Sequence, residues 1–121
     1  MTLILNETDL FNAQSKLTNK EMIIIKFTAD WCVPCQGIKG LVTELVLELP
    51  ESIKFYEIDI EESIDLYAKF KSKKMVTGIP VILGFRGGEK NTWYIPDDSV
   101  MGGNKDEISN FFKRCVKYVS D

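Results

Sequence analysis

The feature of this 121-residue chain that most constrains its fold is the alternation of short apolar runs with helical patterns. Residues 22–28, MIIIKFT, are rich in β-branched side chains and predict a buried strand. Apolar residues then recur at helical spacing over 38–49 and predict an amphipathic helix that ends near Pro50. Residues 53–60, IKFYEIDI, alternate as a half-exposed strand does. Strands that alternate with helices predict a layered α/β domain with helices on both faces of its sheet.

The remainder of the chain continues this alternation. Helical patterns cover residues 8–17 and 62–70, and an apolar run at 79–85 predicts another strand. A turn at RGGE, residues 86–89, and a short strand at NTWYI, residues 91–95, predict a hairpin. The expected order is therefore helix, strand, helix, strand, helix, strand, strand and helix, within a single domain spanning 1–121.

The last helix has a clear predicted start. Asn104 is a good N-cap, and Glu107 follows three residues later as in a capping box. The apolar face of this helix consists of Ile108, Phe111, Phe112, Cys115 and Val119. Cys115 is thus expected to be a buried core cysteine without redox duty; the alternative is an exposed thiol that cross-links dimers under oxidation.

Charge and composition exclude several classes of function. The formal net charge is −3 and the pI about 5.0, which argues against nucleic acid as a partner. No apolar run approaches the ~20 residues of a membrane span. The first residues lack the basic region of a signal peptide, and three cysteines do not make a secreted disulfide framework. We therefore expect a cytoplasmic monomer in a reducing compartment, where a close cysteine pair is more often catalytic or metal-binding than structural.

Cys32 and Cys35 form such a pair, which could be a metal clip, a structural staple or a reactive pair. A structural zinc site takes four Cys or His ligands, but the chain has no histidine and only Cys115 as a further thiol. A c-type haem attachment would need histidine where Gln36 stands. Ligand supply therefore disfavours a metal site.

The position of the pair favours redox chemistry. The cysteines lie where the strand at 22–28 turns into a helix, and Pro34 suits the first helical position. Free backbone N–H groups and the helix dipole would favour the Cys32 thiolate, whereas an unshifted thiol titrates near about 8.5. Side chains three residues apart on a helix lie about 5–6 Å apart, which suits a disulfide. The spacing therefore fits reversible thiol–disulfide exchange.

Two motifs resemble the thioredoxin family. FTADWCVPCQ, residues 27–36, resembles its active-site segment, whose usual core is W-C-G-P-C. TGIPVILGFRGGE, residues 77–89, resembles its cis-proline strand and hairpin. The resemblance implies a thioredoxin fold, with a central mixed four- to five-stranded β-sheet flanked by helices on both faces.

The resemblance also implies a protein-disulfide reductase that needs no cofactor. In that cycle Cys32 attacks a partner's disulfide, Cys35 resolves the mixed disulfide, and a cis Pro80 faces the sulfurs. The implied partners are disulfide-containing proteins and a thioredoxin reductase, with roles in electron transport and cell redox homeostasis.

The same resemblance implies a partner-binding surface around the sulfurs. Trp31, Val33, Pro34 and Ile79 would form it together with Pro80, and would hold a partner's backbone as an added strand is held. Trp31 is expected to be partly exposed rather than an ordinary core aromatic. Val33 replaces the glycine usual between the cysteines, which puts the redox potential and the choice of partner in question.

Lys26 is the largest departure from the family pattern. The family usually has a buried acid at this strand position, with a lysine on the neighbouring strand; the resemblance implies that Glu57 takes the place of that lysine here. One reading is that Lys26 simply points to solvent. The other is a partly buried Lys26–Glu57 pair that could pass the Cys35 proton through Glu57 or a water.

Gly102 and Gly103 leave an alternative electron donor open. The stretch SVMGGNKDEI, residues 99–108, also resembles glutaredoxins, where small residues and a helix start bind glutathione. The simpler reading is a glycine turn that borders the partner groove, as in thioredoxins. A third possibility is a thioredoxin-fold binding subunit without redox turnover.

Overall fold

A four-stranded mixed sheet forms the centre of the computed structural model, which describes residues 4–88 and 92–120. The strands are β1 (Met22–Thr28), β2 (Ile53–Asp59), β3 (Val81–Arg86) and β4 (Asp98–Met101). Their order across the sheet is β2-β1-β3-β4. β1 pairs parallel to β2 and antiparallel to β3, which pairs antiparallel to β4.

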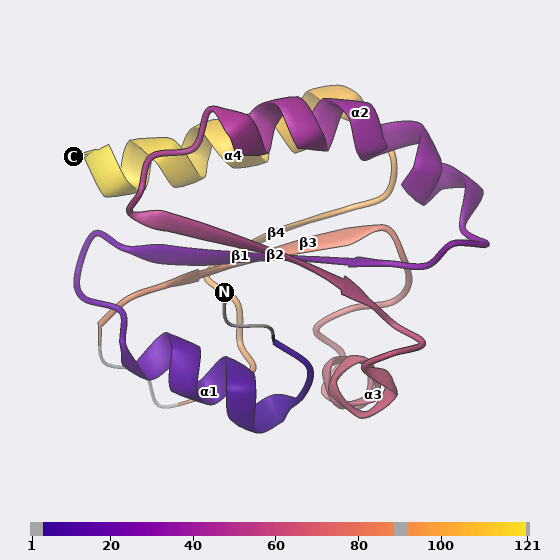
Figure 1. Cartoon of the computed structure of the whole chain (residues 1–121), viewed down its shortest axis with the longest axis horizontal. Helices are drawn as coiled ribbons and strands as arrows, with labels where there is room; N and C mark the ends of the chain where they lie inside the picture. The colour runs from indigo at the N-terminus through magenta and orange to yellow at the C-terminus, as the bar shows by residue number, and fades with distance from the viewer. Residues whose placement is uncertain (1–3, 89–91, 121) are drawn as a thin grey trace.

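Helices cover both faces of this sheet, as the sequence predicts (Figure 1). They are α1 (Glu7–Ser15), α2 (Val33–Leu47), α3 (Ile64–Ser72) and α4 (Lys105–Ser120). α2 and α4 lie on one face, and α1 and α3 on the other (Figure 1). Across residues 4–88 and 92–120, no helix has both the length and the apolar character needed to cross a membrane.

β1 lies inside the sheet because it is apolar on both faces. Ile23, Ile25 and Phe27 join one buried cluster with residues of α1 and α3. Met22 and Ile24 join a second cluster with residues of α2 and α4. Since side chains alternate along a strand, Lys26 falls on this second face, beneath α2 and α4.

The predicted strand at 91–95 is wrong. Residues 92–97 form turns and bends, and the strand that pairs with β3 is Asp98–Met101; Asn91 lies outside the described residues, as does Glu89 of the predicted turn. The Trp93 ring packs against Phe70 with 5.8 Å between centroids. Its carbonyl accepts a hydrogen bond from the Gln14 side chain. The aromatic residues of this segment therefore cover the core from a loop and do not form a hydrogen-bonded strand.

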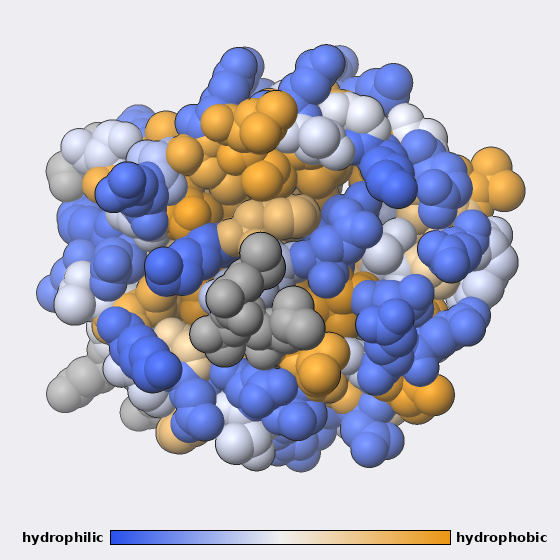
Figure 2. Space-filling view, in the orientation of Figure 1, coloured by the Kyte–Doolittle hydropathy of each residue, from blue (hydrophilic) through white to orange (hydrophobic). Residues whose placement is uncertain are grey.

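The remaining elements lie close to their predicted positions. Asn104 caps α4, because its Oδ1 accepts the Glu107 N–H at 3.0 Å. Four residues of the predicted apolar face of α4 are buried, namely Ile108, Phe111, Phe112 and Cys115, and the fifth, Val119, is partly buried against the same cluster. Hydrophobic side chains gather along part of α2 on the face in Figure 2, whose remainder is mostly hydrophilic. Among the described large hydrophobic residues, Leu47 of α2 is the most exposed, at 81%.

Candidate active site

The cysteine pair lies at the junction between the end of β1 and the start of α2. Cys32 is the N-cap residue of α2, and its sulfur accepts the backbone N–H of Cys35 at 3.2 Å. Pro34 occupies the first turn of the helix, where no backbone donor is needed. A sulfur held against a helix N-terminus is stabilised as a thiolate. The helix therefore starts where the sequence predicts, and its N-terminus lies at the sulfur that it is expected to stabilise as a thiolate.

Cys32 and Cys35 form a disulfide with 5.2 Å between their Cα atoms. Cys32 is 4% exposed and Cys35 is 1% exposed, and Ala29 completes their buried cluster. Ile60 and Ile79 pack against this cluster from the ends of the neighbouring strands. The pair thus closes within one helical turn, with Cys32 slightly nearer to solvent.

The segment that leads into β3, Ile79–Pro80, lies beside the cysteine pair. The Ile79–Pro80 peptide bond is cis, as predicted, and Ile79 packs against the cysteine cluster. The Pro80 carbonyl accepts the Gly102 N–H at 2.9 Å, just after β4. The loops before β3 and after β4 are therefore tied together beside the disulfide.

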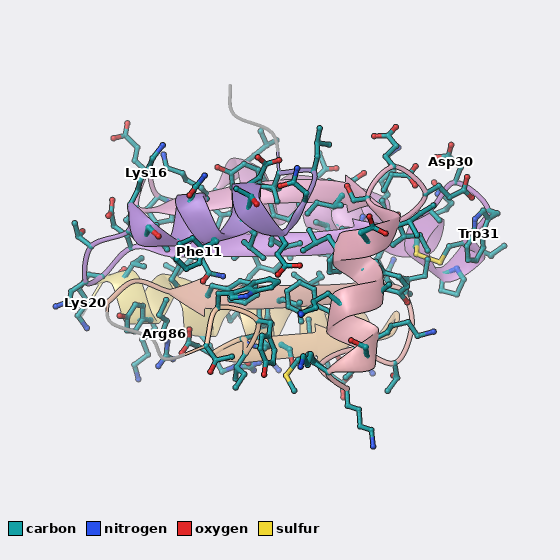
Figure 3. The ribbon with its side chains drawn as sticks, turned by 90° about the horizontal axis from the view of Figure 1, so that it is seen from below. Phe11, Lys16, Lys20, Asp30, Trp31 and Arg86 are labelled. Carbon is teal, nitrogen blue, oxygen red and sulfur yellow. A yellow bond between two sulfur atoms is a disulfide. The ribbon has the colours of Figure 1, made fainter. Side chains whose placement is uncertain are left out.

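Exposed apolar side chains lie next to the Cys32–Cys35 disulfide. Trp31 is 63% exposed, which confirms that it is not a core aromatic, and Val33 is 78% exposed. The indole Nε1 of Trp31 donates to the Glu61 carboxylate, which holds the ring in place. Figure 3 shows the disulfide beside the labelled Asp30 and Trp31, at the opposite end of the molecule from Lys16 and Lys20.

Gly102 and Gly103 border the same surface. Gly102 has φ +90°, a conformation that glycine adopts at little cost. A Cβ on Gly103 would lie 3.9 Å from both Pro34 and Ile38. The structure thus places Gly103 next to the active-site helix and bonds Gly102 to Pro80, in a turn after β4.

Lys26 does not point to solvent, so that reading is wrong. Its side chain is 1% exposed, and Nζ lies 3.5 Å from Glu57 Oε2. The two residues are Cα partners in the β1–β2 register, and the Glu57 side chain is 44% exposed. The partly buried pair therefore exists, with its cation inside and its carboxylate at the surface.

Glu61 is the site residue that the sequence did not reveal. It lies among several acids between β2 and α3, and nothing in the pattern distinguishes the one that meets Trp31. Within the described ranges, no group of three or more His, Cys, Asp or Glu side chains could hold a metal ion.

Cys115 is buried, as predicted, so the exposed alternative is wrong. It is 2% exposed, and burial, with a smaller contribution from Asp98, raises the pKa of its thiol to about 12. We expect a bulky thiol reagent at neutral pH to leave Cys115 unlabelled in the reduced, native protein, so that rapid modification is confined to the active-site pair, beginning at Cys32. Mass spectrometry of the labelled protein checks this, and a third rapidly modified thiol contradicts it.

Comparison with known proteins gives consistent matches. A family model described as Thioredoxin matches residues 2–114. Thioredoxin O1, mitochondrial, from Arabidopsis thaliana is 28% identical over 118 residues, which is 97% of this chain and 56% of that protein. Thioredoxin from Rickettsia typhi is 30% identical over 88 residues, which is 73% of this chain and 80% of that protein. The chain spans about half the length of the plant relatives Thioredoxin O1 (56%) and Thioredoxin M4, chloroplastic (42%).

Solved structures show the same fold. Thioredoxin from Fasciola hepatica has a TM-score of 0.70 at 22% identity, covering 94% of this chain and 98% of that one. Mitochondrial Thioredoxin 3 from Saccharomyces cerevisiae, in its oxidized form, has a TM-score of 0.69 at 22% identity, covering 94% of each chain.

Proposed function

The chain belongs to the thioredoxin family, and on that premise we propose that it reduces protein disulfides through Cys32 and Cys35. The observation that carries the proposal is a cysteine pair at disulfide distance, on the first turn of a helix and beside exposed apolar side chains. A binding subunit without redox turnover needs no such arrangement.

The exchange proceeds in two balanced steps. The Cys32 thiolate attacks one sulfur of a partner's disulfide, forms a mixed disulfide and expels the partner's other sulfur as a thiolate. Cys35 then loses its proton and attacks Cys32, so the second partner sulfur leaves. The partner gains two electrons, and this chain ends with the Cys32–Cys35 disulfide seen in the structure.

The surface around the sulfurs supports docking of a partner. Trp31, Val33 and Pro34 are exposed next to the disulfide. Ile79 is partly buried and packs against the cysteine cluster, and Pro80 is buried directly after it. We propose that an extended partner segment lies across these residues as an added strand.

Insulin reduction tests the proposed function. Catalytic amounts of the protein should accelerate reduction of insulin by dithiothreitol, which is followed as precipitation of the freed chains. A rate equal to that of dithiothreitol alone would favour the binding-subunit alternative.

Glu57 is proposed to accept the Cys35 proton during the second step. Its carboxylate pairs with buried Lys26 and still reaches solvent, so it can exchange protons between the interior and water. Glu57→Gln should slow resolution of a preformed mixed disulfide about tenfold or more, within the range of general base catalysis. Stopped-flow measurements from mildly acidic to mildly alkaline pH check this, and wild-type rates throughout would remove the relay.

The electron donor is proposed to be a thioredoxin reductase with NADPH rather than glutathione. Trp31 and Val33 beside the cysteines depart from the usual glutaredoxin signature. Asp98, which the sequence offered as a charge against glutathione, is instead paired with Arg114 at 2.7 Å. We expect the reductase to sustain turnover and glutathione to give little on a small mixed-disulfide substrate. Comparable rates with glutathione, lost selectively in Gly103→Val, would establish the glutaredoxin-like alternative instead.

The cytoplasmic location and the monomeric state stay predictions. The relatives named above include mitochondrial and chloroplastic proteins.

A further inference from the structure

We propose that Lys26 is a positioning residue whose buried cation stabilises the thiolate of the reduced cysteine pair and thereby sets its reduction potential. The inference rests on the proposed function, because it concerns the same two sulfurs. It differs from the role proposed for Glu57, since Lys26 acts through its charge and transfers no proton.

Lys26 is a charged side chain almost wholly removed from water. It is 1% exposed, and its only ionic partner among the described residues is Glu57, at 3.5 Å. Burying an ammonium group is costly unless an opposite charge compensates it. Because Glu57 is 44% exposed, water screens part of that compensation. The interior therefore retains an unbalanced positive field.

The topology directs this field at the cysteines. α2 connects the parallel strands β1 and β2, so it runs back over β1 in the opposite direction. Ile38 of α2 packs in the same cluster as Met22 and Ile24 of β1. Lys26 follows Ile24 on the same face, towards the end of β1, and Cys35 precedes Ile38 by one helical turn. Lys26 is therefore buried on the face of β1 that α2 covers, near the strand end from which the chain continues to Cys32 and Cys35.

The other groups around Lys26 do not cancel its charge. Its Cα partner on β3 is the apolar Ile82, and its partner on β2 is Glu57. On α2, the titratable groups that face this interior are Cys32 and Cys35 themselves, because Lys39 and Glu44 are exposed. On α4, which covers the same face, the buried titratable group is Cys115, whose thiol stays neutral because burial raises its pKa to about 12. Among the described groups on these elements, Glu57 is therefore the opposite charge paired with Lys26.

A buried cation near the sulfurs favours the reduced state. The disulfide carries no charge, whereas reduction adds two electrons and leaves a thiolate when only one proton is taken up. An opposite charge nearby lowers the pKa of an acid such as a thiol and stabilises that thiolate. The cation should therefore make the pair less reducing than it would be above a neutral side chain.

Two substitutions should move the equilibrium in opposite directions. Lys26→Met removes the cation but keeps an unbranched chain of similar length, so the pair should become more reducing. Glu57→Gln removes the compensating carboxylate and leaves the cation, so the pair should become less reducing. A purely structural role predicts no such opposition of sign.

The equilibrium constant against reduced and oxidised glutathione is measured for each variant at neutral pH. We expect a change of about tenfold in each direction, equivalent to about 30 mV. The thiolate absorbance should titrate at higher pH in Lys26→Met and at lower pH in Glu57→Gln. Lys26→Arg, which keeps the charge, should restore the wild-type equilibrium.

A failure of the inference about Lys26 can be distinguished from a failure of the proposed disulfide reduction. The glutathione equilibrium needs no protein partner, so it can be measured even if insulin is not reduced. Equal constants in the wild type and Lys26→Met, or shifts of the same sign in both variants, would overturn the inference. If Lys26→Met does not fold, the sign of the change in Glu57→Gln, at a half-exposed position, decides alone.

Discussion

Cys32→Ser is expected to abolish catalysis of insulin reduction: the rate constant of the protein with insulin should fall on the order of a thousandfold or more, which leaves only the rate of dithiothreitol alone. Removing a nucleophile that acts as one unit with its neighbours costs most of an enzyme's rate enhancement. A serine hydroxyl at the N-cap of α2 still accepts the Cys35 N–H and preserves the helix start. The loss should therefore come without unfolding, and circular dichroism checks that point.

Cys35→Ser is the matched variant, because it leaves Cys32 in place. Cys32 should still attack, but the mixed disulfide should persist because no second thiol resolves it. Non-reducing electrophoresis should show covalent adducts with Cys35→Ser and none with Cys32→Ser. Full activity in Cys32→Ser, or adducts in that variant alone, would reverse the assigned roles.

The sequence predicted those parts of the fold that depend on local patterns. β1 begins and ends where the run MIIIKFT does, because that run must be buried on both faces of a sheet. The start of α4 also depends on a local pattern, because the Asn104 side chain accepts the backbone N–H of Glu107 three residues later. The cysteine pair was identified with its strand-to-helix position, which sets both its geometry and its electrostatics.

Contacts distant in sequence were predicted less well. NTWYI has the aromatic and β-branched content of a strand, but Trp93 packs against Phe70 in the core. The strand that pairs with β3 is β4 instead. Alternation alone would place Lys26 on the α2 face, but its burial and its contact with Glu57 depend on the β1–β2 register. The Trp31–Glu61 hydrogen bond likewise spans 30 residues and has no local signal.

Gly87→Ala is expected to destabilise the protein by about 3 kcal/mol, at the upper end of the cost of overpacking. A Cβ on Gly87 would overlap the Thr18 carbonyl oxygen and lie 3.0 Å from Leu17 Cβ. The first of these atoms belongs to the backbone and cannot rotate away. Its turn is also held in place, because Thr18 N–H donates to Glu21 Oε1 and Gly87 N–H donates to the Glu21 carbonyl.

Relief would therefore require the 18–21 turn to move away from Gly87, with loss of the hydrogen bond from the Gly87 N–H to the Glu21 carbonyl. Gly40→Ala is the matched control, since a Cβ on Gly40 meets nothing within 4 Å on the surface of α2. It should stabilise the protein by about 0.5–1 kcal/mol, because alanine loses less backbone entropy in a helix. Urea unfolding of both variants measures the difference, and equal stabilities would show that the turn yields at little cost.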